Sequence, residues 1–65
     1  MLLGEIDRLP SEYRLAVVLC DIEDLSNDEA AAAMGVSVGT AKSRLFRGRR
    51  ILRARLSSLM DEMNR

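Results

Sequence analysis

The stretch SVGTAKSRLFRGRRILRAR, residues 37–55, separates small and apolar residues from cations at helical spacing. Advancing about 100° per residue places one stripe on a single side: Ala41, Leu45, Gly48 and Leu52, continued by Leu56 and Leu59. The opposite side carries Gly39, Ser43, Arg47 and Arg50, with Phe46 at its edge. Lys42, Arg49 and Arg53 fall on one flank, and Thr40, Arg44, Ile51 and Arg55 on the other. The pattern predicts one helix with a buried face and a cationic face.

A second helix is predicted directly before this stretch, at residues 27–34. Ser26 and Glu29 have the spacing of a capping box, and Gly35 is suited to end the helix. Its run of alanines, residues 30–33, is small enough for another helix to approach closely. Ser37 then caps the next helix after a turn of about three residues. Two helices joined by a short turn that contains glycine predict a helix-turn-helix at about residues 26–55.

Two further helices are expected upstream. Residues 2–8 form a short one whose apolar face is Leu2, Ile6 and Leu9. Pro10 disfavours helical geometry at the preceding residue and starts a helix over residues 11–23. The repeat in that helix predicts a core face of Leu15, Val18, Leu19 and Ile22, widened by Ala16 and Val17. Asp24 stands where a helix commonly ends in left-handed geometry.

The chain is therefore predicted to be a single all-α domain over residues 1–65, a small bundle of about four helices. With no Trp, one Phe and one Tyr, its core must be aliphatic and thin. Cys20 is the only cysteine and is expected to be a small core residue. One Cys and no His are too few ligands for a metal site, and we expect no cofactor, no small-molecule substrate and no enzymatic activity.

Charge is distributed unevenly along the chain. Residues 1–36 hold eight acids and two arginines, a net charge of −6, whereas residues 37–65 hold eight cations and two acids, a net charge of +6. This asymmetry points to an anionic partner for the second half. No apolar run is long enough to span a bilayer, so we expect no membrane contact and a cytoplasmic protein.

A charge-rich helical face is often only solvated, but five arginines fall between Arg44 and Arg53, and no acid follows on this helix before Asp61. A polyanion would neutralise their repulsion. Phe46, unless it packs on the edge of a neighbouring helix, is placed to contact a thymine methyl group. We assign base contacts to Lys42, Ser43, Phe46 and Arg47. Backbone contacts are assigned to Thr40, Arg44, Arg49 and Arg50, with Val38, Gly39 and Thr40 offering free N–H groups to a phosphate.

Beyond Arg55 the apolar stripe continues through Leu56, Leu59, Met60 and Met63. We expect it to pack on the first helix. The alternative is an adaptable, methionine-bearing surface that docks a protein partner.

Residues 9–53 resemble region 4 of extracytoplasmic-function sigma factors of the bacterial sigma-70 class. The strings LPSEYR, DIEDLS and GVSVGTAKSRLFRGRR, in this order, carry the resemblance. It implies a helical bundle that binds the promoter minus-35 element as double-stranded DNA and touches the flap of the RNA polymerase beta subunit. It also implies a possible anti-sigma factor, and groove-facing positions that match Lys42, Ser43, Phe46 and Arg47.

The resemblance also implies what this chain lacks and where it departs from the family. Nothing matches region 2, so the chain is expected to be a fragment of a longer sigma factor that cannot initiate transcription alone. Asp24 replaces the usual Gly, Ala30 and Ala41 replace larger aliphatics, and Gly48 replaces a better helix former. Because glycine within a helix costs up to about 1 kcal/mol relative to alanine, these changes predict reduced stability.

Two alternatives to promoter recognition stay open. The chain is a protein-interaction module for polymerase or an anti-sigma factor, using its acidic first half and the stripe after Arg55. Or it is a stand-alone helix-turn-helix regulator, which would share the DNA contacts and would normally dimerise.

Overall fold

The computed structural model describes residues 2–64, and side chains from residue 4 onward. The elements are α1 (Leu2–Asp7), α2 (Ser11–Val17), the π-helical turn η1 (Val18–Ile22), α3 (Asn27–Met34) and α4 (Val38–Met63). Between residues 2 and 64 there is no strand. The predicted all-α fold of about four helices is confirmed.

The first two helix ends follow the local sequence. Pro10 precedes α2 with φ −52°, and its carbonyl accepts hydrogen bonds from the N–H groups of Tyr13 and Arg14 at 3.0 and 2.9 Å. The last turn of the predicted second helix widens into η1, where the Glu23 N–H donates to the Val18 carbonyl at 2.9 Å. Asp24 then adopts φ 64°, as predicted.

Capping defines the helix-turn-helix at both of its helix starts. The Ser26 hydroxyl accepts from the Glu29 N–H at 3.1 Å, while the Glu29 carboxylate accepts from the Ser26 N–H at 2.9 Å. This capping box lowers the pKa of Glu29, because both the Ser26 backbone N–H and its hydroxyl stabilise the ionised carboxylate. Gly35 ends α3 at φ 70°, and the Ser37 hydroxyl accepts from the Thr40 N–H at 3.2 Å. All three predicted features are confirmed.

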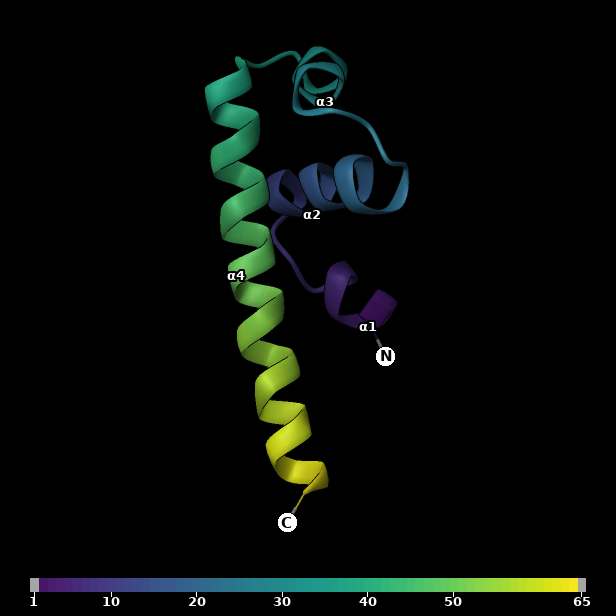
Figure 1. The fold of residues 1–65 in the computed structure, drawn as a ribbon, viewed down its shortest axis with the longest axis vertical. Coiled ribbons are helices and arrows are strands. Elements are labelled where there is room, and N and C mark those ends of the chain that lie inside the picture. The colour runs from purple at the N-terminus through teal and green to yellow at the C-terminus, as the bar shows by residue number, and fades with distance from the viewer. Residues whose placement is uncertain (1, 65) are drawn as a thin grey trace.

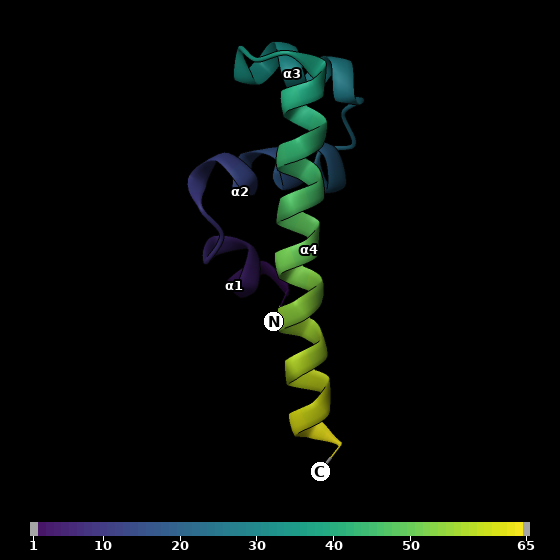
Figure 2. The same cartoon turned by 90° about the vertical axis from the view of Figure 1, so that its left-hand side faces the viewer.

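Helix α4 is the longest element, and the other helices pack beside its first half. Figure 1 shows α3 next to the start of α4, α2 crossing α4 transversely, and α1 near its middle. The view turned by 90° shows the same arrangement, with the last turns of α4 extending beyond every other helix (Figure 2). The molecule is accordingly elongated, 43 Å by 18 Å by 17 Å. No helix within residues 2–64 is long and apolar enough to cross a membrane.

The core joins α1, α2 and α4. Its buried members are Ile6, Leu9, Ala16, Val17, Leu45 and Leu52, with Val18, Cys20, Met34 and Ile51 partly buried against them. The side chain of Leu2, predicted to share the α1 face, lies outside the described residues. Cys20, predicted to be a core residue, is only partly buried against the core. Ile51 is more buried than its predicted position on a cationic flank implied.

The predicted core face of the second helix is partly wrong. Leu15 and Ile22 are 46% and 49% exposed, whereas Ala16 and Val17 are buried. The reason is close packing, because α2 crosses α4 at small residues and only a narrow strip of its surface meets the partner helix. The larger side chains at the same helical spacing consequently lie beside the contact.

The prediction that the stripe after Arg55 packs on α1 is wrong for its last three residues. Leu56 is half-buried, but Leu59, Met60 and Met63 are exposed, Met63 by 83%. Helix α1 is only six residues long and lies near the middle of α4 (Figure 2). It is too short to reach the last turns.

Candidate nucleic-acid interface

The interface is built on the junction of α3 and α4. Ala30, Ala31 and Ala41 are all buried, so small side chains let the two helices approach closely. After Gly35, the Val36 N–H donates back to the Ala31 carbonyl at 3.0 Å, which closes the turn. This is the predicted helix-turn-helix, and α4 is its second helix. The first half of α4 is therefore the candidate recognition helix.

The side chains predicted to contact bases lie together on the exposed side of α4. Lys42, Ser43, Phe46 and Arg47 are all exposed, and Phe46 is exposed by 64%. The alternative that Phe46 packs on a neighbouring helix is not what the structure shows. An exposed aromatic side chain between cations is suited to contact with a base or its methyl group.

Tertiary ion pairs divide the cations of α4 into two groups. Arg44 lies 4.0 Å from Glu12, Arg55 lies 3.3 Å from Glu5, and Arg49 binds Asp21. The acids come from α2, α1 and η1, from the acidic half of the chain. The expectation that a polyanion would neutralise these cations considered acids on the same helix alone, and the structure shows that three of the arginines already have acidic partners on other elements.

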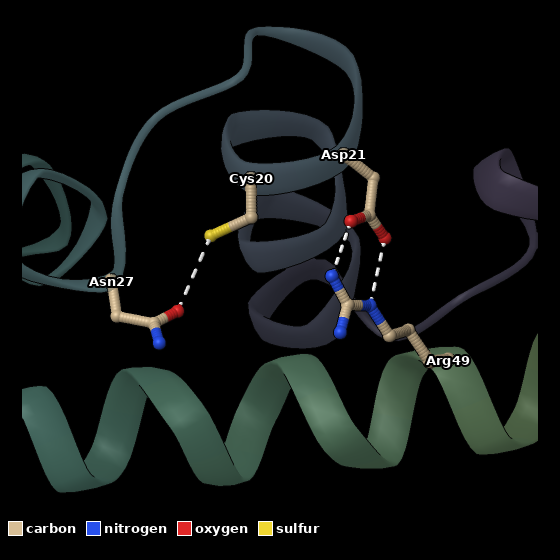
Figure 3. Close-up of polar contacts among 4 residues, drawn as sticks. All are labelled: Cys20, Asp21, Asn27 and Arg49. Carbon is tan, nitrogen blue, oxygen red and sulfur yellow. Dashed lines mark hydrogen bonds and ion pairs between the residues drawn. The ribbon is translucent and has the colours of Figure 1, made fainter.

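Figure 3 shows the pair with two hydrogen bonds, between Arg49 and Asp21. Arg49 donates through Nε to one oxygen of Asp21 at 3.0 Å and through Nη2 to the other at 2.5 Å. This hydrogen bonding raises the pKa of Arg49 above its ordinary value. On the other side of the same turn, the Cys20 Sγ lies 4.0 Å from the Asn27 Oδ1 (Figure 3). Arg49 is thus turned toward η1, away from the exposed side of α4.

The remaining cations share one arc of the helix. Lys42, Arg50 and Arg53 form no ion pair within the described residues, and the contact of Arg47 is with the neutral Tyr13 hydroxyl. At about 100° per residue these four fall within an arc of about 140°, which also holds Ser43 and Phe46. We call this set the outer face: Lys42, Ser43, Phe46, Arg47, Arg50 and Arg53.

A shallow hollow of about 320 Å³ lies next to the outer face, between the start of α2 and the start of α4. Its lining combines predicted DNA-contacting residues with two that sequence reasoning missed, and comprises Glu12, Tyr13, Gly39, Thr40, Ser43, Arg44 and Arg47. Glu12 and Tyr13 are separated from Arg44 and Arg47 by more than thirty positions. No periodicity along the chain signals a pairing over that distance.

Comparison with known proteins adds a decisive observation. Residues 1–52 match the family model described as "Sigma-70, region 4". The chain belongs to the sigma-70 region 4 family. The match covers α1, the core and the whole outer face except Arg53.

Relatives of this region 4 domain are sigma factors by name. It is 53% identical over 57 residues to the ECF RNA polymerase sigma factor SigE of Mycolicibacterium smegmatis, and 38% identical over 55 residues to the ECF RNA polymerase sigma-E factor of Escherichia coli K12. A protein of the latter name from Salmonella typhimurium matches equally well. These matches cover 85% to 88% of this chain but only 22% to 29% of the relatives. The chain thus spans about a quarter of their length.

Proposed function

We propose that this region 4 domain binds the minus-35 element of promoter DNA with its outer face, as part of a longer sigma factor that directs RNA polymerase to initiate transcription. The observation that carries the proposal is the sorting of cations on α4. The acids of the first half hold three arginines, while four cations and an exposed Phe46 lie together on the second helix of a helix-turn-helix. Such a face is suited to a major groove.

The residue roles proposed here keep the base contacts at Lys42, Ser43, Phe46 and Arg47. Arg50 and the N–H groups of Val38 and Gly39 are proposed to contact phosphates. The Thr40 N–H, predicted to be free for the same role, instead donates to Ser37 Oγ at 3.2 Å. Arg44 and Arg49 were predicted for the same role, but each must share its guanidinium with Glu12 or Asp21. The geometry therefore favours Arg50 and Arg53 over Arg49 as backbone contacts.

The test uses duplexes that the 65-residue chain enriches from a randomised pool, compared with scrambled duplexes. Arg47→Ala should lower the preference for the enriched sequence, because it removes a base contact. Arg50→Ala should weaken binding to both duplexes by a similar factor, because it removes a phosphate contact. Equal losses on both duplexes for both variants would contradict the assignment of roles.

A second function, docking to RNA polymerase or an anti-sigma factor, is favoured by the apolar surface that the fold leaves uncovered. A groove of about 390 Å³ runs between α1, η1 and α4, where Ile22 is half exposed and Leu56 half-buried. We propose that polymerase core, through its beta-subunit flap, or an anti-sigma factor contacts this side. Purified core enzyme retained by an Arg47→Ala, Arg50→Ala double variant, but not by Ile22→Glu, would support docking independently of DNA.

The proposal places the protein with promoter DNA in the cytoplasm. A stand-alone regulator is the remaining alternative, and it would normally dimerise. Sedimentation that shows a monomer at high concentration would argue against that alternative.

A further inference from the structure

Within the described residues, the outer face has one side-chain hydrogen-bond partner on another helix. Tyr13, in the first turn of α2, is half-buried, and its hydroxyl oxygen accepts a hydrogen bond from Arg47 Nη1 at 3.4 Å. Tyr13 also lines the hollow beside the outer face, together with Glu12. Helix α2 therefore reaches the side of α4 that is proposed to read DNA.

Gly48 explains how Tyr13 comes so close. A Cβ atom at position 48 would lie 3.3 Å from the Tyr13 carbonyl oxygen and 3.4 Å from the Tyr13 Cβ. It would also lie 2.7 Å from Val17 Cγ2, a distance that requires something to move. The missing side chain next to Arg47 thus lets the backbone of α2 rest directly on α4, and Tyr13 is one of the residues that line the hollow.

An exposed arginine normally samples many rotamers, and binding a base in one geometry costs that freedom. A contact already present in the free protein reduces this cost. The Tyr13 hydroxyl also raises the pKa of Arg47, chiefly by accepting its hydrogen bond. The guanidinium is charged near neutral pH with or without this bond, so the contact affects the orientation of Arg47 and not its charge. The contact is long and exposed, and its expected effect is accordingly modest.

We infer that Tyr13 is a positioning residue for DNA specificity: through its hydroxyl it holds Arg47 in the orientation in which Arg47 meets a base. This inference rests on the proposed function. It adds a determinant on α2, outside the helix-turn-helix, to those on the recognition helix. Tyr13→Phe is the appropriate variant, because it keeps the aromatic ring and the Cβ that lies beside Gly48 and removes only the hydroxyl oxygen.

The first arm of the test needs no DNA. Relaxation of the arginine side-chain ¹⁵Nε nuclei in the free 65-residue protein should show Arg47 more ordered than Arg50, which has no ion pair within the described residues. In Tyr13→Phe the order of Arg47 should fall to that of Arg50, while Arg50 itself does not change. An Arg47 that is equally mobile in both proteins would overturn the inference. If Tyr13→Phe does not fold, the comparison of Arg47 with Arg50 in the wild-type protein still tests the inference, and an Arg47 as mobile as Arg50 would overturn it.

The second arm measures sequence preference with the enriched duplex and its single base-pair variants. Tyr13→Phe should reduce discrimination about threefold, as expected for one lost hydrogen bond, and only at the base pair that Arg47→Ala relaxes. In a double-mutant cycle, Tyr13→Phe should have no effect once Arg47 is alanine. Arg50→Ala is the matched control. In the Tyr13→Phe, Arg50→Ala double variant, the factors by which the two single changes lower the affinity for the enriched duplex should multiply.

The two hypotheses fail differently. If the wild-type chain shows no preference for any duplex, the proposed function is wrong. If the wild type discriminates and Tyr13→Phe discriminates equally well, or lowers affinity for all duplexes alike, only the positioning role is wrong.

Discussion

At the scale of single residues, Gly48 has a role opposite to the one its helix propensity predicts. From the sequence alone, a glycine within a helix is expected to lower helix stability by up to about 1 kcal/mol relative to alanine. In the structure it lies where α2 and α4 touch, and an added Cβ would meet Val17 Cγ2 at 2.7 Å. This close packing could not be predicted from the sequence, because the contact joins positions about thirty residues apart.

We therefore predict that Gly48→Ala destabilises the domain despite the better helix propensity, by about 1 to 3 kcal/mol as typical for overpacking. Urea unfolding followed by circular dichroism would measure it. Gly39→Ala is the matched control, because a Cβ there would meet only Ser37 Oγ at 4.0 Å. A Gly48→Ala protein that is as stable as wild type or more stable would contradict the close contact.

Asp24 is a second residue whose backbone decides its effect. Its φ of 64° is left-handed, a conformation that glycine adopts without a steric penalty and that costs other L-residues about 1 to 2 kcal/mol. Asp24→Gly should therefore stabilise the domain by about 1 kcal/mol in the same unfolding experiment. Asp24→Ala should instead destabilise it, since alanine keeps the Cβ and loses the local polar side chain. Equal stability of the two variants would count against this account.

At the scale of elements, helix ends could be predicted well and helix faces less well. Capping by Ser26 and Ser37, and the stop at Gly35, depend on neighbours within four residues, and they are where the sequence placed them. Burial depends on which part of a face meets another helix. For that reason the apolar spacing of α2 and η1 did not reveal that Leu15 and Ile22 are exposed, and the spacing of α4 did not reveal that Met63 is exposed.

The capping box makes the stability of α3 depend on pH. The pKa of Glu29 is lowered in the folded state from an ordinary value of 4.5. Its stabilising contribution is therefore present above pH 4.5 and is lost as the pH falls through the lower folded pKa. The melting temperature of wild type should fall more steeply below pH 4.5 than that of Glu29→Gln, which lacks this titration. Parallel curves for the two proteins would be evidence against the ionised capping box.

At the scale of the whole molecule, the acidic half acts as an internal counterion for the basic half. Asp21, Glu12 and Glu5 occupy three arginines of α4, and the four remaining cations lie on the outer face. The charge asymmetry in the sequence predicted an anionic partner, which stays a proposal, and it overestimated the number of cations available to such a partner. Which cations remain available depends on the packing of α1, α2 and η1 against α4.

This sorting predicts the salt dependence of DNA binding. With four available cations the log-log slope of affinity against salt should be at most about 3.6, at about 0.9 per phosphate neutralised. Asp21→Asn should release Arg49, raise affinity for all duplexes and steepen the slope by up to about 0.9. Because the Arg49–Asp21 pair is exposed, this variant should change the free energy of unfolding by no more than about 1 kcal/mol. Glu62→Gln removes the same charge without breaking an ion pair of the described residues, and it should leave the slope unchanged.

The central claim is that the outer face of α4 reads base sequence, and fluorescence anisotropy with the enriched and the scrambled duplex tests it most directly. The wild-type chain should prefer the enriched duplex, and Arg47→Ala should reduce that preference about tenfold, as expected for one lost base contact. The wild-type Arg55 guanidinium is held by Glu5, so Arg55→Ala should leave the ratio of the affinities for the enriched and scrambled duplexes at its wild-type value. A ratio that Arg47→Ala leaves unchanged, or that both variants lower equally, would contradict the claim.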